Sequence, residues 1–391
     1  MRVLFLTDSL SELDGVGRYA VRLIEALERQ HPGLEVHVLL ARKHRPTSPE
    51  VPERWRVEVA LPPDYFFYMS PLRFLVSRVL STWRTWRAAR AADLVHAIKD
   101  FPHSLIAVDA AGLAGRPCVA TGHGTYTIQP VLDGRHRRRA FSAYRRFAAL
   151  ISVSRYTRAR LLKIVPEDVL PPARVHVIPN AVDAESFVAP RALEAQPWHG
   201  FRFTLGIGEL KERKGHHLAL EAWARVARDQ PDLHHVIVGN RAGDPYEERL
   251  LAIARDAGLG ERLHLVGNVS EDQKVDLLQR AEVFLHTPVT AADGGFEGFG
   301  IVYLEAAAAG TVAIGTLDSG AEDAIVDGCS GRLVPQEVGA VEQALRAVLG
   351  DDEERARLAE GARAHAVASS WDDNARRVLE LYAEALGERG R

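Results

Sequence analysis

Short apolar runs alternate with longer amphipathic stretches along the first half of the chain. The short runs place apolar residues at consecutive positions, which is typical of strands covered on both faces of a parallel sheet. They span 3–7, 35–40, 93–97, 118–122, 150–153 and 175–178. Helical periodicity separates them, most clearly over 17–30, 72–91 and 137–147. This alternation predicts an α/β domain built on a doubly wound parallel sheet.

The alternation pauses over 188–200, where Pro190 and Pro197 interrupt any period, and then resumes. Further strands are predicted at 203–208, 235–238, 263–266, 283–286 and 312–315. Helices are predicted at 215–229, 245–257, 270–280, 300–309 and 371–386. We therefore predict two Rossmann-like domains, 1–190 and 201–368, joined by a linker. A C-terminal helix within 369–391 follows. Whether this helix crosses back to the N-terminal domain is left open.

Length, charge and cysteine usage narrow the class of protein. The chain of 391 residues suits two domains of about 150–200 residues. A net charge of −3 gives no signal for nucleic acid. Cys118 and Cys329 are the only cysteines and build neither a disulfide framework nor a metal cluster. With no visible signal peptide and no apolar run of 18 residues, the sequence predicts a cytoplasmic protein.

Two stretches are unusually basic, 73–90 and 135–146. The first interleaves five arginines with leucines, valines and two tryptophans, a composition that can lie on an anionic membrane. An ordinary domain helix with its arginines in water has the same composition. Both interpretations stay open, so a peripheral contact with the inner face of a membrane through 73–90 is one of two alternatives.

A glycine loop follows the first strand. Gly15, Gly17 and Ala20 fit the dinucleotide pattern G-x-G-x-x-A, but residues 8–14 separate the glycines from the strand. The second strand is followed by Ala41-Arg42, with no acidic residue for a ribose, so a nicotinamide site is improbable. Either the amides at Gly15–Gly17 hold an anion at a helix start, or the glycines only permit a turn.

The second half carries three further elements. Lys214 ends a turn after a strand and opens a helix, where its ammonium can meet a phosphate. Gly267 and Val269 lie between a strand and a helix, where backbone groups can hold a base edge. Glycines then precede a helix that has Glu297 at its start and Glu305 eight residues on. Two such carboxylates suit a ligand with hydroxyls at both ends. The alternative is that Glu297 is only an acidic residue favoured by the helix dipole and that Glu305 is only a surface glutamate.

The order of these elements over nearly the whole chain resembles the family-4 retaining glycosyltransferases of the GT-B fold. Each motif is weak alone, and the six in this order are specific. They are Asp14–Tyr19, Thr121–Tyr126, Ile178–Asp183, Gly208–Gly215, Glu297 with Glu305, and Asp318–Glu322 with Gly328–Val334. The resemblance implies two Rossmann-like domains that face each other across a cleft, with the acceptor on the first and a nucleotide-sugar on the second.

The resemblance also implies roles, residue by residue. Glu297 contacts the donor sugar and Glu305 the ribose, while Lys214 neutralises the diphosphate and His123 stands near the transferred sugar. The predicted catalytic residues are His123, Glu297 and Lys214. The predicted donor-binding residues are Gly15, Gly17, Gly208, Glu209, Arg213, Lys214, Gly267, Val269, Glu297, Gly298, Phe299, Gly300, Ile301 and Glu305. Asp14 and Tyr126 are predicted to contact the acceptor.

Two residues depart from the family pattern. An arginine that pairs with the diphosphate usually stands where this chain has Glu209, whose charge repels a phosphate. Either Arg213 or another arginine substitutes, or the donor sits differently. Asp14 stands where a glycine is common, and it either reaches the acceptor or only forms a turn.

The expected reaction moves a hexose or N-acetylhexosamine from a UDP- or GDP-sugar to an acceptor hydroxyl, with retention and without a metal or other cofactor. The acceptor is a sugar, a lipid-linked sugar or a natural product. Three alternatives keep the fold: a sugar phosphorylase, an isomerising (epimerase-like) enzyme, or a non-catalytic sugar-nucleotide binder, which Glu209 favours. A reductase is the fourth alternative. Oligomeric state is not predicted.

Overall fold

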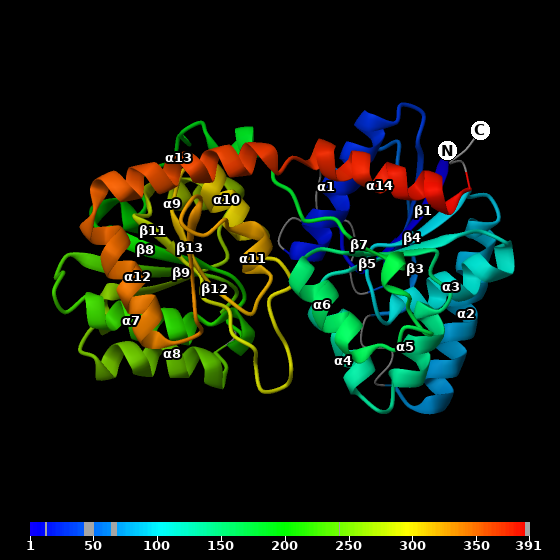
Figure 1. The fold of residues 1–391 in the computed structure, drawn as a ribbon, viewed down its shortest axis with the longest axis horizontal. Helices are drawn as coiled ribbons and strands as arrows, with labels where there is room; N and C mark the ends of the chain where they lie inside the picture. Colours follow the sequence, from blue (N-terminus) through cyan, green and yellow to red (C-terminus); the bar gives the residue numbers. More distant parts are fainter. Residues whose placement is uncertain (12–13, 43–50, 64–68, 242, 388–391) are drawn as a thin grey trace. The chain divides into compact units, whose positions relative to one another are not determined.

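The computed structural model describes residues 1–11, 14–42, 51–63, 69–241 and 243–387 (Figure 1). Contacts divide the chain into two compact units. The first comprises Met1–Asn180 and the segment from Trp371 onward, and the second comprises Ala181–Ser370. The segment 188–200 therefore belongs to the second unit, and the buried Trp198 shows why, since its indole Nε1 donates to Asp276 at 2.8 Å.

The first unit is a seven-stranded parallel sheet with strand order β3-β2-β1-β4-β5-β6-β7. Its strands are β1 (Arg2–Thr7), β2 (Glu35–Ala41), β3 (Arg56–Leu61), β4 (Leu94–Ala97), β5 (Cys118–Gly122), β6 (Ala149–Ser152) and β7 (Val175–Val177). Its helices are α1 (Gly15–Gln30), α2 (Pro71–Ala89), α3 (His103–Ala114), α4 (Thr125–Leu132), α5 (Arg137–Tyr144), α6 (Arg155–Ile164), the 3₁₀ turn Pro172–Arg174 and α14 (Trp371–Ala385).

The second unit is a six-stranded parallel sheet with strand order β10-β9-β8-β11-β12-β13. Its strands are β8 (Arg202–Ile207), β9 (Leu233–Val238), β10 (Leu263–Gly267), β11 (Val283–Leu285), β12 (Ala313–Thr316) and β13 (Gly331–Val334). Its helices are α7 (His216–Val226), α8 (Pro245–Asp256), α9 (Glu271–Arg280), α10 (Ile301–Ala309), α11 (Ala321–Ala324), α12 (Val338–Gly350) and α13 (Asp352–Ala368). Short 3₁₀ turns cover Ala184–Phe187, Pro197–Gly200, Glu212–Lys214 and Gly260–Arg262.

The predicted α/β architecture is confirmed, and the main additions are elements without a continuous apolar run. Strand β3 buries only Ala60 and Leu61, so it lacks a continuous apolar run. Helix α12 carries its buried residues Val341, Leu345 and Val348 at helical spacing, a pattern that was available in the sequence. Helix α14 lies against α1 in the first unit (Figure 1).

Both sheets reverse their strand order at one point, between β1 and β4 in the first and between β8 and β11 in the second. Ligands of open parallel sheets bind outside the carboxyl ends of the strands at such points. The residues that follow these four strands are therefore the first places to search for a site. Among the helices of the described ranges, none has the length and hydropathy needed to cross a bilayer.

Candidate functional site

A buried ion pair lies at the switch point of the second sheet. The turn Glu212–Lys214 follows β8, and the loop before α10 brings Glu297 to it. Lys214 Nζ lies 2.5 Å from Glu297 Oε2, and both side chains are largely buried. The sequence suggested both residues separately, and the structure brings them into direct contact.

Further cationic and aromatic groups surround the Glu297 carboxylate. Arg213 Nη1 lies 3.8 Å and the buried His286 Nε2 lies 3.7 Å from Glu297 Oε2. Burial alone would raise the pKa of the Glu297 carboxyl, but the neighbouring Lys214 and Arg213 hold that pKa well below its ordinary value. The carboxylate is therefore charged at neutral pH. His286, which follows β11, was not predicted.

The start of α10 is shaped by glycines. Gly300 takes φ +85°, and a β-carbon there would meet the ring of Tyr303. A β-carbon at Gly320 would overlap the backbone of Gly298 and Phe299, and the Gly320 N–H donates to the Glu297 carbonyl at 2.9 Å. The first N–H groups of a helix lack partners within it, so those around Phe299–Ile301 are available to an anion.

Glu305 is held inside the second unit by a lysine that the sequence did not single out. Lys274 Nζ, from α9, lies 3.1 Å from Glu305 Oε1 and 2.8 Å from Glu271 Oε1. Glu305 and Lys274 are both buried, whereas Glu271 is open to solvent. Glu305 is thus no surface glutamate. Lys274 lies five residues after Val269, the last residue predicted in the loop between β10 and α9. Lysine is rare in this chain, and that rarity could have marked Lys274 as a candidate.

Other predicted donor residues line the same strand ends. The Gly208 N–H donates to the Val238 carbonyl at 2.9 Å, so this amide is already used in a backbone hydrogen bond with β9. Gly267 takes φ +80° at the end of β10, and Val269 is half-buried before α9. Glu209 and Arg213 form an ion pair of 3.1 Å.

In the first unit, His123 follows β5 and its ring orientation is fixed. Its Nε2 lies 2.8 Å from the Ile98 carbonyl, which only accepts, so Nε2 carries the proton and Nδ1 the lone pair. The ring also meets Tyr19 edge-on at 4.8 Å between centroids. Burial lowers the pKa of His123 to about 4, with the positive charge of Lys99 acting in the same direction. The imidazole is therefore neutral at physiological pH.

A polar cluster that the sequence did not predict surrounds this loop. Lys99, after β4, lies 3.1 Å from Asp8, after β1, and 4.5 Å from the ring centroid of Tyr126. Asp100 accepts from the Thr127 hydroxyl at 2.6 Å and from the His123 N–H at 3.3 Å. Burial raises the pKa of Asp100 to about 6. These contacts tie the carboxyl end of β4 to the His123 turn.

The first glycine loop is organised by Asp14. Its carboxylate accepts from the Gly17 N–H at 2.7 Å and from the Ser9 hydroxyl at 2.5 Å, so it caps α1. A β-carbon at Gly17 would overlap the backbone of Ser11, whereas one at Gly15 would meet nothing. Only glycine fits at position 17 for this steric reason. The Gly17 N–H is already bonded to the Asp14 carboxylate. The loop positions 12 and 13 lie outside the described residues.

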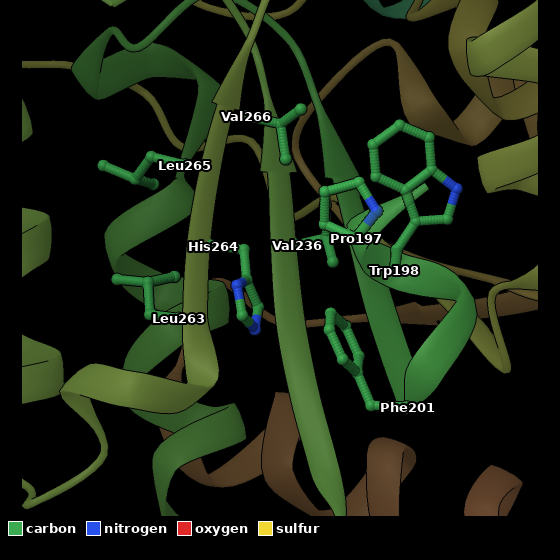
Figure 2. Close-up of a pocket in the computed structure, with 8 residues that line it drawn as sticks. All are labelled: Pro197, Trp198, Phe201, Val236, Leu263, His264, Leu265 and Val266. Carbon is green, nitrogen blue, oxygen red and sulfur yellow. The ribbon is translucent and has the colours of Figure 1, made fainter. Parts of the chain in front are cut away.

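A hollow of about 380 Å³ lies elsewhere in the second unit (Figure 2). Figure 2 shows Trp198 and Phe201 on one side of it, with His264 on the facing strand. Its lining is Pro197, Trp198, Phe201, Val236, Leu263, His264, Leu265 and Val266. No formally charged side chain lines it, so it does not suit a diphosphate. Within the described ranges, no cluster of three or more His, Cys, Asp or Glu could hold a metal ion.

Comparison with known families agrees with this geometry. The family model for Glycosyltransferase Family 4 matches residues 13–186, and the model for Glycosyl transferases group 1 matches residues 194–365. The chain belongs to the family-4 glycosyltransferases. Together the two matches cover most of both units.

Two relatives of this glycosyltransferase show the extent of the similarity. A D-inositol 3-phosphate glycosyltransferase of Corynebacterium urealyticum is 32% identical over 227 residues, which are 54% of this chain and 51% of that relative. The chain therefore matches about half the length of that relative. A phosphatidyl-myo-inositol mannosyltransferase of Mycolicibacterium smegmatis is 29% identical over 385 residues, covering 95% of this chain and 91% of the relative.

The fold has close counterparts among solved structures. The crystal structure of Anabaena Alr3699/HepE in complex with UDP and glucose superposes with a TM-score of 0.76, covering 98% of this chain and 100% of that one. At 20% sequence identity this likeness shows the fold alone. It confirms the predicted GT-B architecture of two Rossmann-like domains.

Proposed function

We propose that this glycosyltransferase moves a hexose or N-acetylhexosamine from a UDP- or GDP-sugar to an acceptor hydroxyl, with retention and without a metal. The observation that carries the proposal is the buried Lys214–Glu297 pair beside Arg213 and the start of α10. The cations supply charge for a leaving diphosphate, and the carboxylate accepts from sugar hydroxyls. Relatives of this chain are named as sugar transferases, which agrees with the proposal.

In this reaction the bond from the sugar C1 to the phosphate oxygen breaks, and a bond from the acceptor oxygen to C1 forms on the same face. The acceptor proton passes to the departing phosphate oxygen. Lys214, Arg213 and the first N–H groups of α10 stabilise the charge on the diphosphate. His123 offers the Nδ1 lone pair of a neutral imidazole, which orients a hydroxyl without adding positive charge beside the oxocarbenium-like sugar.

A donor screen tests the proposal. We expect UDP or GDP to raise the melting temperature of the whole chain, because a ligand present at about 100 times its Kd adds about 2.7 kcal/mol of stability. ADP serves as the control nucleotide. Incubation with the matching radiolabelled sugar nucleotide then separates transfer from isomerisation and from binding without turnover. Flat melting curves with UDP and GDP would contradict a nucleotide-sugar enzyme.

Helix α2 favours an acceptor at a lipid surface. Its exposed side carries Leu72, Leu75, Val76, Val79, Leu80 and Trp83, at helical spacing. Its buried side is mostly small and polar, with Ser81, Thr82 and Thr85.

The helix holds no acidic residue, and Arg73, Arg84 and Arg87 are exposed beside the apolar stripe. An amphipathic helix with its apolar face outward and arginines at the border suits an anionic membrane. We therefore propose a peripheral membrane contact and a lipid-linked acceptor, as the name of the mannosyltransferase relative also suggests.

Co-sedimentation with vesicles tests the membrane contact. We expect binding to vesicles that contain an anionic phospholipid at low salt, and a roughly tenfold or greater loss in the variant Leu75→Ser/Val79→Ser/Trp83→Ser. That triple change removes about 2 kcal/mol or more of apolar transfer free energy. The matched control is Leu113→Ser/Val367→Ser, because both side chains are 68% exposed outside α2. Equal sedimentation of the two variants would exclude α2 as the contact.

A further inference from the structure

Glu209 places a negative charge beside the site proposed for a diphosphate. It stands two residues beyond β8, and its side chain is 54% exposed. By itself, such a carboxylate would weaken the binding of an anion. Its contacts point to a different effect, because both of its carboxylate oxygens are engaged by cations. Lys211 Nζ lies 3.1 Å from Oε1, and Arg213 Nη2 lies 3.1 Å from Oε2.

Arg213 is held by this contact at a defined place. One end of its guanidinium donates to Glu209, while Nη1 lies 3.8 Å from Glu297 Oε2, the same oxygen that Lys214 contacts. Its carbonyl accepts from the Val289 N–H at 3.1 Å, and Gly295 lies against its stem. The arginine is thus fixed at its backbone, along its stem and at one guanidinium nitrogen. Its head stands beside Lys214.

The remaining donors of Arg213 are suited to an anion. A guanidinium has five N–H donors in a rigid fork, and Glu209 uses only the Nη2 end. The five charged side chains Glu209, Lys211, Arg213, Lys214 and Glu297 sum to +1, so the cluster keeps a positive charge although it contains two carboxylates. Ordering a long side chain before the ligand arrives removes part of the entropy lost on binding.

We propose that Glu209 is a positioning residue that aims Arg213 at the donor diphosphate, so that Arg213 acts as the second cation of the site beside Lys214. The assignment rests on the proposed function, because it takes the diphosphate of a sugar nucleotide as the anion. It reverses the role that the charge of Glu209 suggests, and it distinguishes this chain from a site in which a single arginine occupies the position of Glu209.

The sign of one substitution separates the two roles. If Glu209 only repels the diphosphate, Glu209→Gln removes a negative charge and tightens nucleotide binding. If Glu209 positions Arg213, the same substitution weakens binding, because the neutral amide holds the guanidinium less firmly. For the positioning role we expect a roughly tenfold rise in the Kd of UDP or GDP and in the donor KM, with a smaller change in kcat.

A double-mutant cycle on the full chain completes the test. Titration calorimetry with UDP and with GDP is run on the wild type, Glu209→Gln, Arg213→Gln and the double variant. Because Glu209 acts through Arg213, the double variant should bind no more weakly than Arg213→Gln. The matched control is Glu342→Gln on α12, which likewise removes an arginine-paired carboxylate and should leave the Kd unchanged. Melting curves of all variants identify any loss of folding.

The outcomes separate this assignment from the proposed function. Tighter binding in Glu209→Gln, or losses that multiply in the double variant, would overturn the positioning role while the nucleotide site stands. A wild type that binds neither UDP nor GDP would overturn the proposed function and this assignment together.

Discussion

Lys214→Ala is expected to abolish the nucleotide-induced rise in melting temperature and to lower kcat/KM roughly 10²–10³-fold, the usual effect of removing one charge-stabilising donor. The reason is its position, with Nζ 2.5 Å from Glu297 Oε2 in a largely buried site. The change also leaves Glu297 with a buried, less compensated charge, so the free energy of unfolding should fall by about 3 kcal/mol. Donor kinetics and urea unfolding measure the two effects.

A second variant separates catalysis from folding. Lys214→Ala/Glu297→Ala removes both charges, so it should recover part of the lost stability but none of the nucleotide binding. Lys163→Ala, an exposed lysine of α6 in the first unit, serves as the control and should behave as the wild type. If Lys214→Ala keeps the wild-type melting response to UDP or GDP, the ion pair is only structural.

Glu305→Ala is expected to have the second largest effect. We propose that Glu305 accepts from the ribose hydroxyls of the donor. Because a charged acceptor contributes about 1.5–3 kcal/mol, we predict a roughly 10- to 100-fold rise in donor KM. The change also removes the buried partner of Lys274, whose Nζ lies 3.1 Å from Glu305 Oε1. Since Lys274 keeps the exposed Glu271, we expect the free energy of unfolding to fall by only about 1–3 kcal/mol. Donor kinetics and urea unfolding again separate the two.

A companion to Glu305→Ala tests whether the kinetic loss follows from instability. Lys274→Met/Glu305→Leu replaces the buried pair with apolar groups of similar volume and should restore most of the stability. It should not restore the donor KM, because no carboxylate remains for the ribose. Recovery of normal donor kinetics in this double variant would show that Glu305 acts through folding and not through the nucleotide.

Local sequence patterns offered Lys214, Glu297 and the glycines before α10 as candidates, and the resemblance to the family gave these candidates their weight. Each lies in a strand-to-helix segment shortly before a helix begins, and such segments can be read from apolar runs and glycine spacing. The same reading could not find Lys274, His286 or Asp100. Each of these lies in a separate segment from its partner, and only the order of strands in the sheet brings the two together.

The sequence by itself therefore determined the family, the two parallel-sheet units and the strand-to-helix turns that bear the functional groups. Continuous apolar runs and turn-forming residues each involve only a few neighbouring positions, so they can be recognised from the sequence alone. The tertiary structure decided the pairings. It showed that Asp14 caps α1 with the Gly17 amide, that α14 packs with the first unit, and that Glu209 holds Arg213 beside Lys214. The first two of these depend on how the chain closes its loops and places its C-terminal segment, and the third on side-chain rotamers, none of which local periodicity records.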